Sequence, residues 1–428
     1  MNRFLYCALF YLATPVILLR LLWRSLRAPD YRKRWAERFA FYGDLPLRRV
    51  DVVFHTVSVG EVHAAVPLIR KLQAHDPSLE ILVTTTTPTG SARVPAMLGD
   101  TVQHVYLPYD YPGAVNRFLD RFAPRLLVIM ETEWWPNLVH CCAVRGVRLM
   151  LANARLSEKS QGNYQRMHKL AGEMLKSFDA VTGQSQHDRD RLVALGLPPA
   201  KVEIAGSMKY DMMLNADMLV QARQDKKAMA GRPVLIAAST RTLDGEAEEE
   251  KILQAFGTLV AERPDLLLVL VPRHPERFDS VAALAGKRGF SIARRSRDRI
   301  ALPEQQVLIG DSMGEMQYYF GLADIAFVGG SLVNTGCQNI IEPAAIGLPV
   351  ITGPSLYNFQ AVSEAMIAVQ GMLVVANAAE LAAVVKSLLD NPSQQQVMGE
   401  AARSVVEANQ GATARNLAVL SGLLGSAR

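Results

Sequence analysis

The fold is decided by the stretch Ala323-Asp-Ile-Ala-Phe-Val-Gly-Gly-Ser-Leu-Val-Asn-Thr-Gly-Cys-Gln-Asn-Ile-Ile-Glu-Pro-Ala-Ala-Ile-Gly-Leu-Pro-Val-Ile-Thr-Gly-Pro354. This stretch predicts a strand, a glycine-rich loop, a short helix with Glu342 in its first turn, and a second strand. A loop with few Cβ atoms lets backbone N–H groups approach a phosphate, and a helix N-terminus favours negative charge. A carboxylate one turn into the helix is well placed to accept hydrogen bonds from a ribose. The stretch therefore predicts a nucleotide site at the end of a parallel sheet.

Strand patterns alternate with helical patterns on both sides of this stretch. The predicted strands form two series, 52–56, 81–86, 102–107, 126–130, 148–153 and 180–183, then 234–238, 266–271, 291–293, 307–309, 325–328 and 350–352. Strands separated by helices imply parallel sheets covered on both faces, so the fold class is α/β with two Rossmann-like domains. We expect an N-terminal domain over 29–212, a polar linker over 213–232 and a C-terminal domain over 233–428.

Length and composition agree with a folded protein of two domains. A chain of 428 residues is long for one core, and half of its residues are hydrophobic with one fifth charged. The net charge of +5 comes partly from basic clusters near the N-terminus and over 287–299. Few aromatic residues lie within the second cluster, so no nucleic-acid partner is expected. The four cysteines include no Cys-x-x-Cys pair, which indicates a reducing compartment rather than a disulfide framework or zinc site.

The N-terminal segment is apolar enough to seek a membrane. Residues 4–19 are almost entirely apolar, and 21–23 extend the run past Arg20 to a length marginally sufficient to span a bilayer. A basic cluster follows, which by the positive-inside rule keeps the body of the protein cytoplasmic. A cleaved signal peptide fits poorly because no small-x-small cleavage site precedes the basic run. Residues 1–28 are therefore expected to form a membrane anchor; Pro15 leaves a helix lying in the interface as the alternative to a spanning helix.

Acidic residues follow two predicted strands of the first series. Glu61 opens a helix after strand 52–56, where it is a candidate general base or simply an acid that favours the helix dipole. The helix N-terminus lowers the pKa of such a carboxyl group, so a base at this position requires burial to offset that effect. Glu131 and Glu133 follow strand 126–130, before Trp134. Lys209 lies where the first series ends and could meet an anionic group.

Three loops follow strands of the second series: 237–241, before a helix that opens over 245–250, then 272–277 and 310–315. Prolines on both sides of Arg273 and His274 restrict the second of these loops, which pre-organises Arg273 for a phosphate. The third loop carries Ser312 and Glu315 at the spacing of a capping box, which is the alternative to a ligand contact. The pattern Asp188-Arg-Asp190 matches the Asp-x-Asp of metal-dependent transferases, but it follows a predicted helix cap. No metal site is expected.

Ten motifs together resemble one family nearly end to end. They are Tyr31-Arg-Lys-Arg-Trp35, Val57-Ser-Val-Gly-Glu61, Thr87-Pro-Thr-Gly-Ser91, Met130-Glu-Thr-Glu133, Ala152-Asn-Ala-Arg-Leu-Ser157, Gly206-Ser-Met-Lys209, Pro272-Arg-His-Pro-Glu-Arg277, Met313-Gly-Glu315, Phe327-Val-Gly-Gly-Ser-Leu332 and Asn339-Ile-Ile-Glu342. The chain resembles the 3-deoxy-D-manno-octulosonic acid (Kdo) transferases of lipopolysaccharide synthesis.

The resemblance implies the GT-B fold and an inverting, metal-independent transfer of Kdo from CMP-Kdo to the tetra-acylated lipid A precursor (lipid IVA). The reaction would take place at the cytoplasmic face of the inner membrane and would need no cofactor. Glu61 would be the general base, and Glu131 and Lys209 would support the transition state. The resemblance places CMP on Pro272, Arg273, Met313, Gly314, Glu315, Asn339, Ile340, Ile341 and Glu342.

The chain also departs from its relatives. Many members of the family have Gly-His-Asn where this chain has Cys337-Gln-Asn339, and many carry His where Arg241 stands. Both departures concern the donor loops rather than the reaction. Two other functions fit the same fold: a soluble sugar-nucleotide epimerase, disfavoured by the N-terminal anchor, and a non-catalytic membrane scaffold, disfavoured by Glu61, Glu131 and Lys209.

Overall fold

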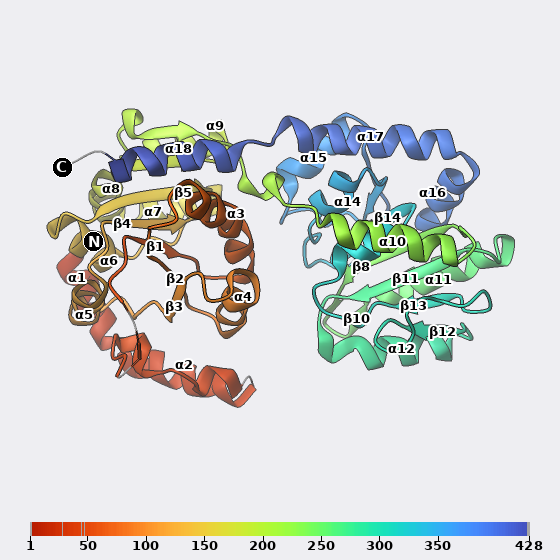
Figure 1. Ribbon diagram of the computed structural model, residues 1–428, viewed down its shortest axis with the longest axis horizontal. Coiled ribbons are helices and arrows are strands. Elements are labelled where there is room, and N and C mark those ends of the chain that lie inside the picture. Colours follow the sequence, from red (N-terminus) through yellow and green to blue (C-terminus); the bar gives the residue numbers. More distant parts are fainter. Residues whose placement is uncertain (1, 28, 44, 47, 426–428) are drawn as a thin grey trace. The chain divides into compact units, whose positions relative to one another are not determined.

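The chain folds into two compact units, which are considered separately (Figure 1). The structure, a computed structural model, describes residues 2–27, 29–43, 45–46 and 48–425. Unit 1 comprises Met1–Met212 and Asn409–Arg428, and unit 2 comprises Met213–Ala408.

Unit 1 is built on a parallel sheet of seven strands in the order β3-β2-β1-β4-β5-β6-β7. The strands are β1 (Val52–His55), β2 (Ile81–Thr85), β3 (Gln103–Tyr106), β4 (Leu126–Met130), β5 (Arg148–Ala154), β6 (Ala180–Gly183) and β7 (Val202–Ile204). The central strands β1, β2 and β4 are buried along their whole length, as their continuous apolar sequences require. The strand order reverses between β1 and β4, and that switch point is where open α/β sheets bind ligands.

Helices cover both faces of this sheet. They are α3 (Val59–His75), α4 (Pro88–Leu98), α5 (Pro112–Phe122), α6 (Pro136–Val144), α7 (Glu158–Gln165), α8 (His168–Ser177), α9 (Gln186–Ala194) and α18 (Ala412–Gly425), with short 3-10 turns η1 (Pro29–Arg32), η2 (Ala36–Phe39), η3 (Pro199–Lys201) and η4 (Met208–Asp211). Side chains of Ser58, Thr87 and Ser185 accept backbone N–H groups at the starts of α3, α4 and α9. Each is a helix cap that fixes where a strand-to-helix loop ends.

The N-terminal segment forms two helices, α1 (Arg3–Leu12) and α2 (Thr14–Arg27), instead of one. They bend by 52° at the break, beside Pro15, which has no N–H to donate to the preceding turn. Among the helices that the structure describes, none is by itself long and apolar enough to cross a membrane; only this bent pair, taken together, meets the length and composition.

Unit 2 is built on a second parallel sheet of seven strands, in the order β12-β13-β11-β8-β14-β15-β16, with a separate two-stranded hairpin. Its strands are β8 (Val234–Thr240), β9 (Thr242–Leu243), β10 (Glu246–Ala247), β11 (Leu267–Pro272), β12 (Ile292–Arg294), β13 (Val307–Ile309), β14 (Ile325–Val328), β15 (Val350–Thr352) and β16 (Met372–Val374). The order reverses between β8 and β14, so this unit also has a switch point.

The helices of unit 2 are α10 (Ala216–Ala228), α11 (Glu248–Glu262), α12 (Phe278–Lys287), α13 (Met316–Leu322), α14 (Ile341–Ile346), α15 (Gln360–Ala368), α16 (Ala378–Asp390) and α17 (Pro392–Ala408), with one 3-10 turn, η5 (Pro275–Arg277). The stretch that opened the sequence analysis forms β14, a loop over 329–340, α14 and β15. This order of elements confirms the prediction of strand, loop, short helix and strand.

The division into units differs from the predicted domains at two places. The predicted linker 213–232 belongs to unit 2, where α10 lies so close to α13 that a Cβ on Gly321 would meet the Cβ of Ala222 at 2.7 Å. The last residues belong to unit 1: α18 packs on α3, and Ala412 and Leu420 are fully buried in that core. Figure 1 shows α18, in blue, beside the elements of unit 1.

Candidate active site

Glu61 lies at the switch point of unit 1, in the first turn of α3. Its carboxylate accepts the N–H of Val57 (2.7 Å) and the hydroxyl of Ser58 (2.9 Å), and its side chain is only 8% exposed. Burial raises the pKa of Glu61 to about 7; the hydrogen bond from Val57 opposes this, and the charges of Glu131 and Glu133 add to it. Burial therefore outweighs the helix N-terminus, and Glu61 can take up a proton near neutral pH.

Glu131 and Lys209 form an ion pair in the same unit. Lys209, in η4, places its Nζ atom 3.2 Å from Oε1 of Glu131, which follows β4. Glu131 has a φ of 57°, in the left-handed region that costs a non-glycine residue energy. Strain of this kind is common where a side chain must be aimed at a ligand. The structure thus brings together Glu131 and Lys209, with Glu61 close enough for the charge of Glu131 to affect its pKa.

Asn153 is a residue of this site to which the sequence assigned no role. It lies at the end of β5, next to β4, and also has a left-handed φ, of 55°. Its Oδ1 atom accepts the N–H of Met208 (3.0 Å), so it fixes the backbone immediately before Lys209. Its Nδ2 atom is buried and has no hydrogen-bond partner among the described residues. The motif Ala152-Asn-Ala contained this residue, but only the three-dimensional contact with Met208 shows what it does.

A cavity of about 400 Å³ adjoins the acidic loop after β4. Tyr6 of α1, Glu133, Trp134, Trp135 and Tyr164 line part of it. Burial raises the pKa of Glu133, and Glu131 raises it further. The indole N–H groups of both tryptophans are buried without partners among the described residues. Trp134 is nearly buried and stacks on Tyr164 with ring centroids 4.5 Å apart, so it is at least partly a core residue.

A basic cluster lies at the ends of β8 and β11 in unit 2. The N–H of Arg273, directly after β11, donates to the carbonyl of Thr240 at the end of β8 (3.0 Å). Burial lowers the pKa of His274, and Arg241, Arg273 and Arg277 lower it further, so three guanidinium groups lie near one imidazole. A cluster of this kind favours an anionic ligand.

Two carboxylates balance part of this charge. Glu249, fully buried, pairs with Arg277 at 2.6 Å, which fixes that guanidinium within the protein. Glu342, in α14, accepts a hydrogen bond from Nδ2 of Asn339 (3.0 Å); burial raises its pKa, and Arg273 opposes that effect. The structure therefore brings Arg273 close to Glu342, two of the residues predicted to bind the donor nucleotide.

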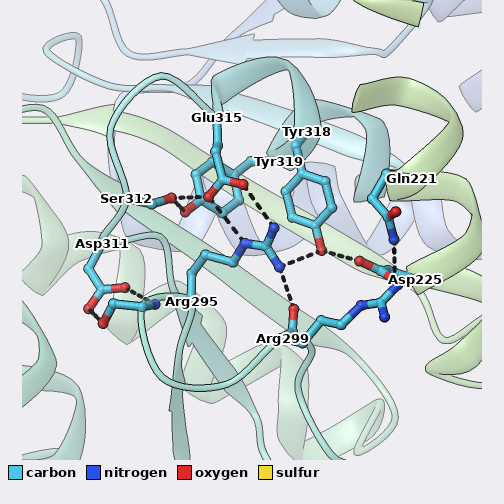
Figure 2. A network of polar contacts seen from close by, with 10 residues as sticks. Gln221, Asp225, Arg295, Arg299, Asp311, Ser312, Glu315, Tyr318 and Tyr319 are labelled. Carbon is cyan, nitrogen blue, oxygen red and sulfur yellow. Dashed lines mark hydrogen bonds and ion pairs between the residues drawn. The ribbon is translucent and has the colours of Figure 1, made fainter. Parts of the chain in front are cut away.

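The loop before α13, with Met313, Gly314 and Glu315, is held by a polar network (Figure 2). Two guanidinium nitrogens of Arg295 donate hydrogen bonds to the carboxylate of Glu315, at 2.8 and 3.2 Å, and the hydroxyl of Ser312 also donates to this carboxylate. The capping box, which was the alternative to a ligand contact, does not form, because α13 begins after Glu315 and neither side chain caps it. The Glu315 carboxylate is therefore engaged within the protein, and its backbone is what the loop can offer a ligand.

The glycine-rich loop after β14 does not present the free phosphate cradle that the sequence predicted. The N–H groups of Gly330 (2.6 Å), Ser331 (3.0 Å) and Leu332 (2.8 Å) all donate to the carboxylate of Glu248. Burial raises the pKa of Glu248, and these hydrogen bonds oppose it. Glu248 lies more than eighty residues earlier in the chain, so no local pattern revealed the contact.

The described part of the chain contains no group of three or more His, Cys, Asp or Glu side chains arranged to hold a metal. Ser185 caps α9 by accepting the N–H of Asp188, and the carboxylate of Asp188 accepts the N–H of Leu156 (2.8 Å), so Asp188 has a structural role. Two of the three residues that depart from the family pattern lie in the loop after β14: Cys337 is fully buried, and Gln338 donates its backbone N–H to Gly329 (2.9 Å).

Comparisons with known proteins agree with this geometry. The family model described as 3-deoxy-D-manno-octulosonic-acid transferase (kdotransferase) matches residues 33–212, and the model for glycosyl transferases group 1 matches residues 198–405. A 3-deoxy-D-manno-octulosonic acid transferase from Haemophilus influenzae is 41% identical over 98% of each chain, and one from Bordetella pertussis is 39% identical over 87% of each.

Solved structures of lower identity share the fold. A UDP-GlcNAc 2-epimerase from Neisseria meningitidis has a TM-score of 0.58 at 14% identity, covering 88% of this chain and 99% of its own. A glycosyltransferase from Rickettsia africae has a TM-score of 0.58 at 13% identity, covering 89% of this chain and all of its own. These likenesses confirm the GT-B fold. The extensive identity to the two curated transferases decides the family, and the chain belongs to the 3-deoxy-D-manno-octulosonic acid transferases, a family of glycosyltransferases.

Proposed function

We propose that this enzyme transfers Kdo from CMP-Kdo to the tetra-acylated lipid A precursor (lipid IVA), with inversion and without a metal, at the cytoplasmic face of the inner membrane. The observation that carries the proposal is the buried Glu61, whose pKa of about 7 suits a general base, near the Glu131–Lys209 ion pair.

In the proposed reaction, Glu61 removes the proton from a hydroxyl group of the acceptor sugar. The hydroxyl oxygen forms a bond to the anomeric carbon of Kdo, and the bond from that carbon to the phosphate oxygen of CMP breaks. CMP leaves with the electron pair, and the proton stays on Glu61. Lys209 stabilises the negative charge that develops in the transition state, and Glu131 holds its ammonium group in place at 3.2 Å.

The donor binds through residues of unit 2, in this proposal. Arg273 contacts the single phosphate of CMP, supported by the basic cluster around His274. Glu342 accepts hydrogen bonds from the ribose, and Asn339, which donates to Glu342, orients that carboxylate. The remaining contacts come from Pro272, Met313, Gly314, Glu315, Ile340 and Ile341, mainly through their backbones.

The lipid acceptor requires a membrane surface, and the N-terminal helices can provide contact with it. α1 and the start of α2 lie against the body of unit 1: Tyr6 of α1 bonds to Asp110, and Oγ1 of Thr14 in α2 lies 2.8 Å from the hydroxyl of Tyr111. Several large apolar side chains of these helices face outward, with Phe4 83% and Leu12 76% exposed, and Arg20 and Arg24 of α2 are exposed beside them. We therefore propose that α1 and α2 lie in the interface rather than span the bilayer. The nearby cavity beside Glu133 would then receive an apolar part of the acceptor.

The test is a transfer assay with the full chain. Purified enzyme is incubated with lipid IVA in detergent or vesicles and with CMP-Kdo, and the lipid is then analysed by mass spectrometry. We expect the mass of the lipid to increase by one or more Kdo units, and the spectrum also gives their number. A parallel reaction with UDP-GlcNAc tests the epimerase alternative. Absence of Kdo transfer, or epimerisation of UDP-GlcNAc, would contradict the proposal.

A further inference from the structure

Glu248 occupies the switch point of unit 2, between the ends of β8 and β14. It is the first residue of α11, and its side chain is fully buried. One carboxylate oxygen accepts the N–H groups of Arg241 (3.1 Å) and Gly330 (2.6 Å), and the other accepts those of Ser331 (3.0 Å) and Leu332 (2.8 Å). A side-chain carboxylate thus fills the group of amides that a ligand phosphate would otherwise use at this place in the fold.

The surrounding backbone is shaped to admit this carboxylate. A Cβ atom on Gly329 would meet Oε2 of Glu248 and Cα of Thr240, each at 2.7 Å, so only glycine fits there. Lys251, one turn further along α11, donates to the carbonyl of Leu332 (3.1 Å) and holds the same loop from the other side. All four partners of the Glu248 carboxylate are N–H donors, which stabilise its ionised form. These donors fit a carboxylate at the switch point, and they oppose the burial that raises its pKa.

This carboxylate lies next to the residues that are proposed to hold the donor. Arg241, whose N–H bonds to Glu248, directly follows Thr240, and the carbonyl of Thr240 accepts the N–H of Arg273 (3.0 Å). The side chain of Arg273 also lies near Glu342. The phosphate of CMP can meet this basic cluster, but a second phosphate reaching towards the switch point would find its amides occupied and would be repelled by a buried carboxylate.

We propose that Glu248 is a specificity-determining residue, which takes the place of a second phosphate and makes unit 2 select nucleotides with one phosphate over nucleotides with two. The inference rests on the proposed function, because that function places CMP on the neighbouring loops. It adds a cause for the selection of a nucleoside monophosphate donor.

Binding of CMP and CDP to the full chain, measured by isothermal titration calorimetry, tests this inference. In the wild type we expect CDP to bind at least about tenfold more weakly than CMP, because like charges repel strongly when they are shielded from water. Glu248→Gln keeps the size of the side chain and removes its charge, so the ratio of the two dissociation constants should move about tenfold in favour of CDP. Glu250→Gln is the matched control: Glu250 is exposed in the same helical turn, and its loss should leave the ratio unchanged.

Two results would overturn the inference. The first is that the wild type binds CDP as tightly as CMP; this result needs no variant, so the inference can be tested even if Glu248→Gln folds poorly. The second is that a folded Glu248→Gln protein has the same ratio of CMP and CDP dissociation constants as the wild type. Failure of the proposed function is a different result, since it appears as absence of Kdo transfer by the wild type, whereas this inference can fail while transfer is intact.

Discussion

The two switch points of the molecule each hold a buried glutamate at the start of the helix that follows the first strand of the sheet. In unit 1 it is Glu61 of α3, and in unit 2 it is Glu248 of α11. Glu61 accepts one backbone N–H and one hydroxyl, from Val57 and Ser58, while Glu248 accepts four backbone N–H groups. The same position in the fold therefore carries two carboxylates with different surroundings.

The different hydrogen-bond partners of Glu61 and Glu248 show that the same residue type at the same position of a fold can have two functions. Burial alone raises the pKa of a carboxyl group, and each N–H donor offsets part of that rise. With few donors and with Glu131 nearby, Glu61 has a pKa of about 7 and can exchange a proton during a reaction. Glu248 holds a loop through four N–H donors, and these donors oppose the rise in pKa that burial causes. Substitutions in unit 1 and in unit 2 can therefore test the two functions separately.

The largest expected effect is the loss of transfer in Glu61→Gln. An amide of the same size cannot accept the proton, and removal of a general base lowers kcat by about a thousandfold. The measurement is the rate of Kdo transfer from CMP-Kdo to lipid IVA. In the wild type, kcat should rise with pH, reach half of its maximum near pH 7, where Glu61 is half ionised, and level off at higher pH.

Binding of CMP distinguishes this loss from misfolding, because Glu61→Gln should bind CMP as the wild type does. Glu173→Gln, on an exposed position of α8, is a control that should keep full activity. If Glu61→Gln retains more than a tenth of the wild-type rate, Glu61 is not the base.

Glu248→Gln, unlike Glu61→Gln, should act mainly on the stability of the protein. The four amides lose their charged acceptor, and an uncompensated buried polar group of this kind costs about 3 kcal/mol of unfolding free energy. Because a protein of two units need not unfold in one step, amide hydrogen exchange over residues 329–332 is the more direct measurement. Protection of these amides equal to that in Glu250→Gln would show that Glu248 does not hold the loop.

The third prediction concerns the pH dependence of stability in unit 1. Between the ordinary pKa of 4.5 and about 7, folded Glu61 keeps a proton that the unfolded chain has released, so the unfolding free energy falls as pH rises. The fall amounts to at most about 3 kcal/mol, is complete above pH 7, and should be absent from Glu61→Gln. Denaturation of both proteins at pH 5, 6, 7 and 8 gives the difference directly. Parallel curves for the two proteins would mean that burial does not raise the pKa of Glu61.

The sequence predicted the architecture well because the central strands are continuous apolar runs and are buried on both faces. Strands 126–130, 180–183, 307–309, 325–328 and 350–352 have the bounds that were expected. The edge strands β7 and β16 were missed; each has only three residues, and only the first of them is buried. The return of α18 to unit 1 was also missed, because it depends on packing against α3 rather than on any feature of the linker before it.

The candidate site was predictable where a residue acts through its position at the end of a strand. Glu61, Glu131 and Arg273 were chosen as candidates in this way, and their roles stay predictions; the ion pair of Glu131 with Lys209 is a finding of the structure. Contacts between distant loops could not be read from spacing. The sequence assigned no role to Glu248, although its partners lie in the loop from which the nucleotide site was inferred.

The smallest expected effect comes from Arg295→Met, which loosens the loop that carries Met313, Gly314 and Glu315. The guanidinium of Arg295 holds the Glu315 carboxylate at 2.8 and 3.2 Å, and it does not belong to the proposed catalytic group (Figure 2). Loss of this hydrogen-bonded pair should raise the KM for CMP-Kdo about tenfold and leave kcat unchanged. Arg297→Met is the control: Arg297 is exposed, two residues after Arg295, and its substitution removes an equal charge. It should leave KM and kcat unchanged. A fall in kcat with KM unchanged would instead mean that Arg295 acts on the chemical step, and the division between a chemical site in unit 1 and a nucleotide site in unit 2 would then not hold.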